Sequence, residues 1–202
     1  MESVDIPNGA SPQGPDTSDW SFLDRTPEDL AVSSQEDFDQ ACKIAHAYAK
    51  DYKVGAGDKT TFESIGDRIG NDFQFKYTRG GGVNTLAGQL KERSIENTDC
   101  KLPTLIFALA WNELNPGNAT EIVCPDRNND HPFVRTKTDD GDIYGHFTAP
   151  DTSKDLSHFT LFTDKHIDRL QKSMNVDFRN GIKTYPLTLE GMKNMDRQFI
   201  ED

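Results

Sequence analysis

The spacing of apolar residues predicts helices in the first half of the chain. After Ser34, apolar side chains recur at helical intervals and form one stripe: Phe38, Ala41, Cys42, Ala45, Ala49 and Tyr52. Ser34 and Asp37, three positions apart, resemble a capping box at a helix N-terminus. Similar but shorter patterns predict helices over residues 61–69 and 83–93.

The most apolar segment of the chain predicts a central helix. The i, i+3, i+4, i+7 rule is followed here by Leu102, Leu105, Ile106 and Leu109. We expect Thr98 or Asp99 to be the N-cap of this helix, and Asn115-Pro116-Gly117 to end it. Because most of the intervening residues are also apolar, this helix should be buried at the centre of the fold.

The second half of the chain changes to the alternating pattern of β-strands. Strands are predicted over residues 119–124, 131–138, 143–149 and 157–163, and a short extended segment over 73–77. A turn centred on Asp140-Gly141 joins the second and third of these strands. A last helix is predicted over residues 167–174, and residues 175–202 carry no clear pattern. Helices followed by antiparallel strands are typical of the α+β class.

Composition divides the chain of 202 residues into a tail and one domain. Residues 1–33 are rich in Pro, Gly, Ser and Asp without a period, which predicts a flexible N-terminal tail before a domain over 34–202. The net charge of −12 disfavours binding to nucleic acids and to anionic membranes. No signal peptide or membrane-spanning pattern is visible, so we expect a cytoplasmic protein.

Three cysteines are too few, and too far apart, for a disulfide framework or a Cys-based metal site. The Asp and His residues also show no EF-hand, HExxH or paired-His spacing, and neither a cofactor nor a bound metal is expected. Cys42 and Cys124 fall within apolar patterns and are interpreted as buried packing residues. Cys100 differs because it lies at the predicted start of the central helix, where free N–H groups and the helix dipole favour the reactive thiolate.

A nucleophilic cysteine needs a base, and the base usually needs a carboxylate that orients it. His131 begins a predicted strand, and pairing about Asp140-Gly141 places it opposite residues 150 and 151, which suggests Asp151 as the acid. A second hypothesis uses His146 as the base and Asp164 as the acid, across the next predicted hairpin. The sequence leaves both pairs open.

The residues around Cys100 and His131 resemble motifs of the transglutaminase-like superfamily. In residues 99–117 a cysteine opens an apolar helix that ends at a glycine, as in the nucleophile helix of that superfamily. Residues 131–136 are similar to its His-Ala-Trp-Val-Glu-Val strand, with Phe133 in place of the tryptophan. Residues 147–152 resemble its Trp-x-x-x-Asp-Pro-Thr ending, with the order of Pro150 and Asp151 reversed.

The resemblance implies a papain-like α+β core, in which the nucleophile helix packs on an antiparallel sheet. It also implies acyl transfer or amide hydrolysis through a Cys-His-Asp triad and a thioester intermediate. The implied substrates are peptides, proteins, or small amines and amides. Two alternatives stay open: a catalytically inactive binding module of the same fold, and an unrelated acidic interaction protein.

Overall fold

The structure is a computed structural model that describes residues 32–52, 58–73, 85–91, 100–125, 131–148, 158–174 and 182–201. Four helices come first: α1 (Gln35–Ala49), α2 (Lys59–Asp72), α3 (Leu86–Lys91) and α4 (Lys101–Leu114). Four strands follow: β1 (Thr120–Pro125), β2 (Phe133–Thr138), β3 (Gly141–Thr148) and β4 (His158–Thr163). The chain continues with α5 (Asp164–Met174), β5 (Ile182–Tyr185) and α6 (Leu189–Glu201). The α+β class is as predicted, and so are the helices and strands from α1 to α5 in their order.

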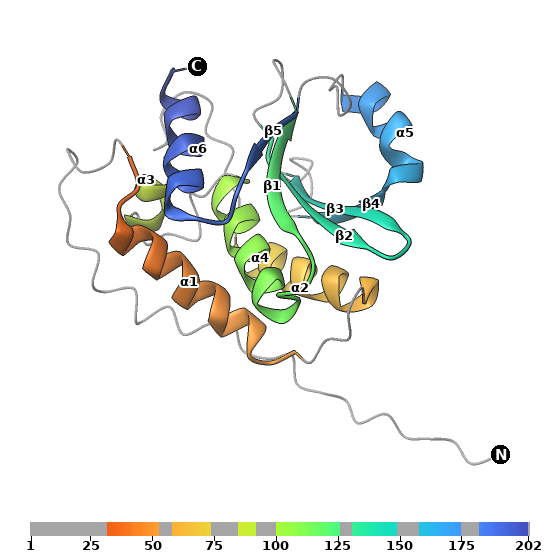
Figure 1. The fold of residues 1–202 in the computed structure, drawn as a ribbon, viewed down its shortest axis with the longest axis horizontal. Helices are drawn as coiled ribbons and strands as arrows, with labels where there is room; N and C mark the ends of the chain where they lie inside the picture. Colours follow the sequence, from red (N-terminus) through yellow and green to blue (C-terminus); the bar gives the residue numbers. More distant parts are fainter. Residues whose placement is uncertain are drawn as a thin grey trace, which may run out of the picture.

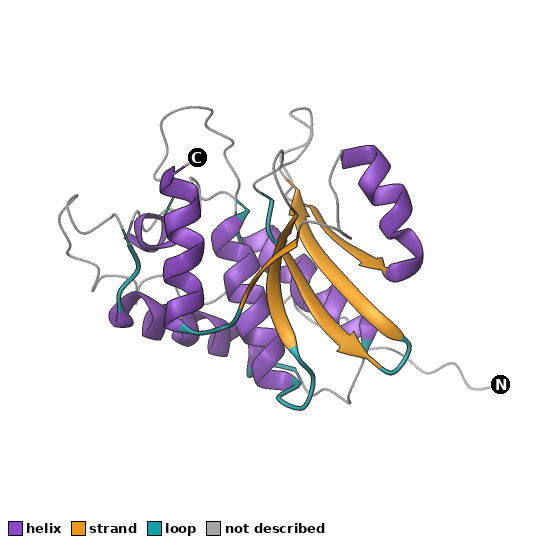
Figure 2. Cartoon of the chain, turned by 45° about the horizontal axis from the view of Figure 1, so that its top comes forward, coloured by secondary structure: helices purple, strands orange, loops and turns teal. Residues whose placement is uncertain are grey.

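The strands form one sheet in the order β4-β3-β2-β1-β5, and the pairings between described strands are antiparallel. Helices α4 and α5 lie on opposite sides of this sheet (Figures 1 and 2). Alternate residues of each strand therefore face different helices. Val134 and Ile143 belong to the apolar cluster around α4, whereas Phe133 and Tyr144 pack in a smaller cluster with Ile167 of α5.

Helix α4 occupies the centre of the fold, as its all-round apolar pattern predicts. Every residue from Lys101 to Trp111 is buried. Phe107 meets Phe62 of α2 edge to face with ring centroids 4.6 Å apart. The indole N–H of Trp111 donates to the hydroxyl of Thr136 on β2 at 3.3 Å. The aromatic contact thus holds α4 against α2, and the buried hydrogen bond holds it against the sheet.

The N-cap predicted for α1 is confirmed, and the N-cap predicted for α4 is not. The predicted capping box is present at α1, where Ser34 accepts from the backbone of Asp37 and Asp37 accepts from the backbone of Ser34. The N-cap of α4 is Cys100, so the prediction of Thr98 or Asp99 is wrong. The reason is that α4 begins without a side-chain cap, so the preference of Thr and Asp for caps does not set its start.

Two smaller expectations concern segments at the limits of the described residues. Phe73 is the C-cap of α2 rather than the start of an extended segment, and residues 74–77 lie outside the described residues. Most of the predicted tail, residues 1–31, also lies outside them. Ser33, assigned to that tail, is instead buried and donates to the carboxylate of Asp196 on α6. The folded part thus begins before residue 34.

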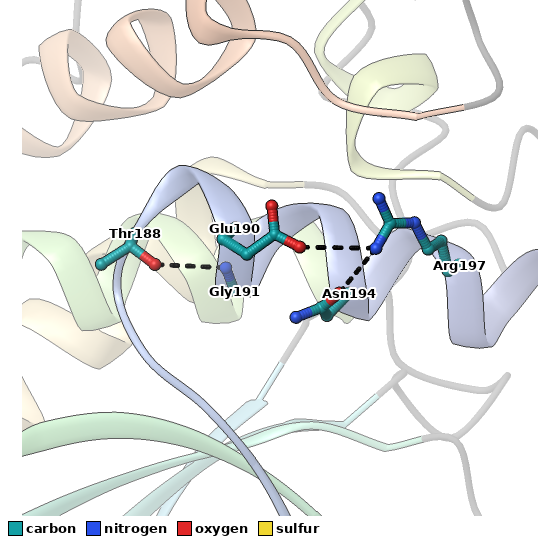
Figure 3. A network of polar contacts seen from close by, with 5 residues as sticks. All are labelled: Thr188, Glu190, Gly191, Asn194 and Arg197. Atoms are coloured by element: carbon teal, nitrogen blue, oxygen red, sulfur yellow. Dashed lines mark hydrogen bonds and ion pairs between the residues drawn. The ribbon is translucent and has the colours of Figure 1, made fainter.

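The C-terminal region, which the sequence leaves unassigned, completes the fold. Strand β5 pairs with β1 through Ile122↔Tyr185 and the neighbouring positions. Thr188 directly precedes helix α6, and its hydroxyl accepts the N–H of Gly191 at 3.2 Å (Figure 3). Its exposed face carries Arg197, which donates to Glu190 and Asn194. Its other face carries the buried Asp196.

None of the helices in the described part of the chain is both long enough and apolar enough to span a membrane.

Candidate active site

The candidate site lies at one end of the sheet, where α4 begins, β2 begins and β3 ends (Figure 1). Cys100 directly precedes α4, and His131 stands two residues before β2. His146 is near the end of β3. These three side chains come from separate segments. Because β2 and β3 are antiparallel, the start of β2 lies beside the end of β3.

Cys100 is held in place by the first turn of α4. Its carbonyl oxygen accepts the N–H of Thr104 at 3.2 Å and the hydroxyl of Thr104 at 2.6 Å. The side-chain oxygen of Gln89, on α3, accepts the N–H of Leu102 at 3.3 Å. Gln89 is itself buried, so a side-chain amide is fixed at the same turn as the thiol. The thiol is 9% exposed and makes no capping bond.

The thiol of Cys100 contacts the imidazole of His131. The distance from Sγ to Nδ1 is 3.4 Å, which is within hydrogen-bond range for sulfur. The ring of His131 is half-buried. A nucleophile and a base within such reach are the minimum arrangement for a cysteine-based reaction.

His146 lies beside His131 on the same face of the sheet. It pairs with Phe133 across β2 and β3, and His131 is two residues before Phe133, so the two histidines are diagonal neighbours. Their ring centroids are 5.6 Å apart, with the rings at 81°. His146 also stacks on Phe133 at 4.3 Å.

The environment of His146 keeps its imidazole neutral. Its side chain is 1% exposed, and neither Nδ1 nor Nε2 has a hydrogen-bond partner. Burial and the neighbouring His131 lower the pKa of His146 to about 3. A buried group of this kind avoids the cost of desolvating a charge. His146 is therefore a polar but uncharged side chain, and the ring of His131 lies next to it.

The register of the β2–β3 hairpin corrects the argument for Asp151. Thr138 pairs with Gly141, so Asp139 and Asp140 form the turn. Gly141 starts β3 with φ 112°, a conformation that glycine adopts readily. Continuing the pairing Phe133↔His146 by two residues places His131 opposite residue 148, not 150 or 151. Asp151 itself lies outside the described residues.

The second hypothesis, His146 with Asp164, also depended on a register that the structure corrects. His146 pairs with Thr160, and Ile143 pairs with Thr163. Asp164 follows Thr163 as the first residue of α5, so its backbone lies near the other end of β3 from His146. The imidazole in contact with Cys100 is that of His131, not of His146.

The two other cysteines lie in apolar, packed surroundings. Cys124 is 1% exposed in β1 and belongs to the main apolar cluster. Cys42 is half-buried on α1. Burial, and then the charges of Asp39 and Glu113, raise the pKa of the Cys42 thiol and oppose its ionisation. Both are packing residues rather than candidate nucleophiles.

Sequence reasoning missed Gln89 and misjudged His146. Gln89 reaches the site from a different helix, eleven residues before Cys100 in the chain, and no local motif marks it. The signal for His146 was its strand register, since a hairpin with Asp139 and Asp140 in its turn places it diagonal to His131.

Comparison of the chain with family models, with curated proteins and with solved structures found no match. Across the described ranges, no group of three or more His, Cys, Asp or Glu side chains could hold a metal ion.

Proposed function

We propose that the protein catalyses cysteine-dependent acyl transfer or amide hydrolysis, with Cys100 as the nucleophile and His131 as the base. The observation that carries this proposal is the 3.4 Å contact between Cys100 Sγ and His131 Nδ1 at the start of a buried helix. The resemblance to the transglutaminase-like superfamily supports the same chemistry, and a papain-like core belongs to the proposal. Peptides, proteins, or small amines and amides are the substrates.

The first half of the reaction forms a thioester. His131 Nδ1 accepts the thiol proton, and the thiolate of Cys100 attacks the carbonyl carbon of an amide or ester. The tetrahedral intermediate then collapses: the bond to the leaving amine or alcohol breaks, and His131 returns the proton to that group. The acyl group stays on the sulfur of Cys100.

The second half releases the acyl group. An amine or a water molecule loses a proton to His131 and attacks the thioester. The C–S bond breaks, and the thiolate of Cys100 takes the proton back. An amine acceptor gives a transferase, and water gives a hydrolase.

Two groups at the first turn of α4 are suited to stabilise the oxyanion. The backbone N–H of Cys100 is at the N-terminus of the helix, where N–H groups lack partners within the helix. The side-chain amide of Gln89 is fixed at the same turn by its contact with Leu102 N–H. We assign its N–H2 group as the second donor.

The test is the pH dependence of Cys100 alkylation by iodoacetamide. The measurement uses the full chain with Cys42→Ser, because Cys42 is the other cysteine that is not fully buried. Paired with His131, Cys100 should react at neutral pH about tenfold or more faster than an ordinary thiol, whose titration lies near pH 8.5. In the variant His131→Gln the rate should fall to that of an ordinary thiol.

A second measurement addresses acyl transfer itself. An activated acetyl ester should acetylate Cys100, which intact mass and peptide mapping would show, and an added amine should remove the acetyl group. Cys100→Ala is the matched control and should not be acetylated at this position. If Cys100 reacts like a free thiol and His131→Gln changes nothing, the enzyme hypothesis is wrong and a binding module of the same fold becomes the better interpretation.

A further inference from the structure

We propose that His146 is the third member of the site, a neutral imidazole that orients His131 in the place where a carboxylate was expected. This inference rests on the proposed function, because it concerns the residue that positions its base. His146 makes no hydrogen bond to the thiol and is proposed to act through His131, so we describe it as a positioning residue.

The ring of His146 lies next to the ring of His131, the base of the proposed reaction. The Nδ1 atom of His131 faces Cys100, so a group that fixes the ring must act on Nε2, the other ring nitrogen. The ring of His146 is 5.6 Å from that of His131, centroid to centroid, and is set edge to face. Catalytic hydrogen bonds are often long before a substrate binds and shorten in the complex.

The burial of His146 is the second, independent observation. Both of its ring nitrogens are buried without hydrogen-bond partners, which costs free energy in a folded protein. A histidine that served only to stack on Phe133 could be replaced there by an apolar ring without that cost. The two unpartnered nitrogens therefore indicate a function beyond packing.

The chemistry suits a neutral acceptor. When Nδ1 of His131 accepts the thiol proton, its Nε2 must carry a hydrogen, and a neutral imidazole has one nitrogen that can accept from it. His146 stays neutral at physiological pH because burial and His131 lower its pKa to about 3. Its partners on the neighbouring strands are Phe133 and Thr160, neither of which titrates near neutral pH. Among these neighbours of His146, His131 is thus the group that gains and loses a proton in the proposed reaction.

Two substitutions separate positioning from packing. His146→Phe keeps a ring to stack on Phe133 but removes both nitrogens, whereas His146→Asn keeps a hydrogen-bond acceptor. Alkylation of Cys100 is measured against pH, from about pH 5 to pH 9, in the Cys42→Ser background. We expect His146→Phe to lower the rate at neutral pH about tenfold and to shift the profile toward higher pH, because the protonated form of His131 loses its acceptor. His146→Asn should restore most of the rate.

Asp151→Asn is the comparison variant, because the sequence suggested Asp151 as the acid. It should leave the alkylation profile unchanged. The proposal is overturned if His146→Phe has the wild-type profile while His131→Gln does not, or if Asp151→Asn shows the loss instead. If His131→Gln has no effect, the proposed function itself fails, so the two failures are distinguishable.

A measurement on the protein without substitutions at His146 covers the case in which these variants do not fold. The imidazole ¹⁵N shifts of His146 should report a neutral ring in one tautomer and should change when Cys100 is alkylated. Unchanged shifts on alkylation would contradict a link between His146 and the Cys100–His131 pair.

Discussion

At the scale of single residues, consecutive positions of β3 have opposite environments. Gly145 faces the cluster around α4, and His146 faces the side of Phe133. A Cβ atom at Gly145 would lie 2.7 Å from the ring of Phe159 and 2.8 Å from that of Phe107. Only glycine lets these two rings approach the strand so closely.

Gly145→Ala should therefore destabilise the protein. The added methyl must displace two buried aromatic rings, and such overpacking costs about 1–3 kcal/mol. The free energy of unfolding from urea titration measures this cost. The control is Gly117→Ala, since a Cβ there meets nothing within 4 Å, and its effect should stay within about 0.5 kcal/mol. Equal effects at both positions would contradict the packing described for Phe159.

At the scale of elements, α6 links the starts of α1 and α3 through one carboxylate. Asp196 accepts the N–H of Ser33 at 2.8 Å and the N–H of Leu86 at 2.6 Å, and the hydroxyl of Ser33 also donates to it. Leu86 begins α3, the helix that carries Gln89. The C-terminal helix thus supports the candidate site indirectly, by fixing the helix from which Gln89 reaches the first turn of α4.

Asp196→Ala should destabilise the protein by about 2–4 kcal/mol, because it leaves buried N–H groups at Ser33 and Leu86 without their acceptor. Arg197→Ala, the next residue of the same helix, is the matched control. Its contacts to Glu190 and Asn194 are exposed, so the change should be below about 1 kcal/mol (Figure 3). Thermal and urea unfolding measure both. Similar losses for the two variants would show that helix propensity, not the buried carboxylate, matters.

At the scale of the whole molecule, the buried His146 makes stability depend on pH. Its pKa is lowered to about 3 in the folded protein from 6.5, so below pH 6.5 the unfolded chain binds a proton that the folded protein does not. Stability is thus lost as the pH falls from 6.5 toward 3. Burial raises the pKa of Asp72 and of Asp196, which gives a dependence of opposite sign at acidic pH.

The contribution of His146 is isolated by comparison with His146→Phe. The difference in unfolding free energy between the two proteins should shift in favour of the variant as the pH is lowered from about 6 to about 4, approaching 1.4 kcal/mol per pH unit. Urea titrations at several pH values provide this difference. A difference that does not change with pH would mean that His146 is protonated in the folded protein.

The elements that could be predicted are those with local causes. The stripe after Ser34 and the all-round apolar pattern around Leu105 predict α1 and α4 because helical periodicity is a property of neighbouring residues. The alternating pattern predicts β1 to β4 for the same reason. Strand β5 could not be predicted, because a four-residue strand at the edge of a sheet is stabilised by its pairing with β1.

The sequence by itself determined the class of the fold, the buried helix and the candidate nucleophile at its start. Only the tertiary structure decided which side chains meet that nucleophile. The cause is strand register: the turn formed by Asp139 and Asp140 pairs Phe133 with His146, and this brings the ring of His146 to the side of His131. The packing of α3 decided the place of Gln89 in the same way, through a contact between distant helices.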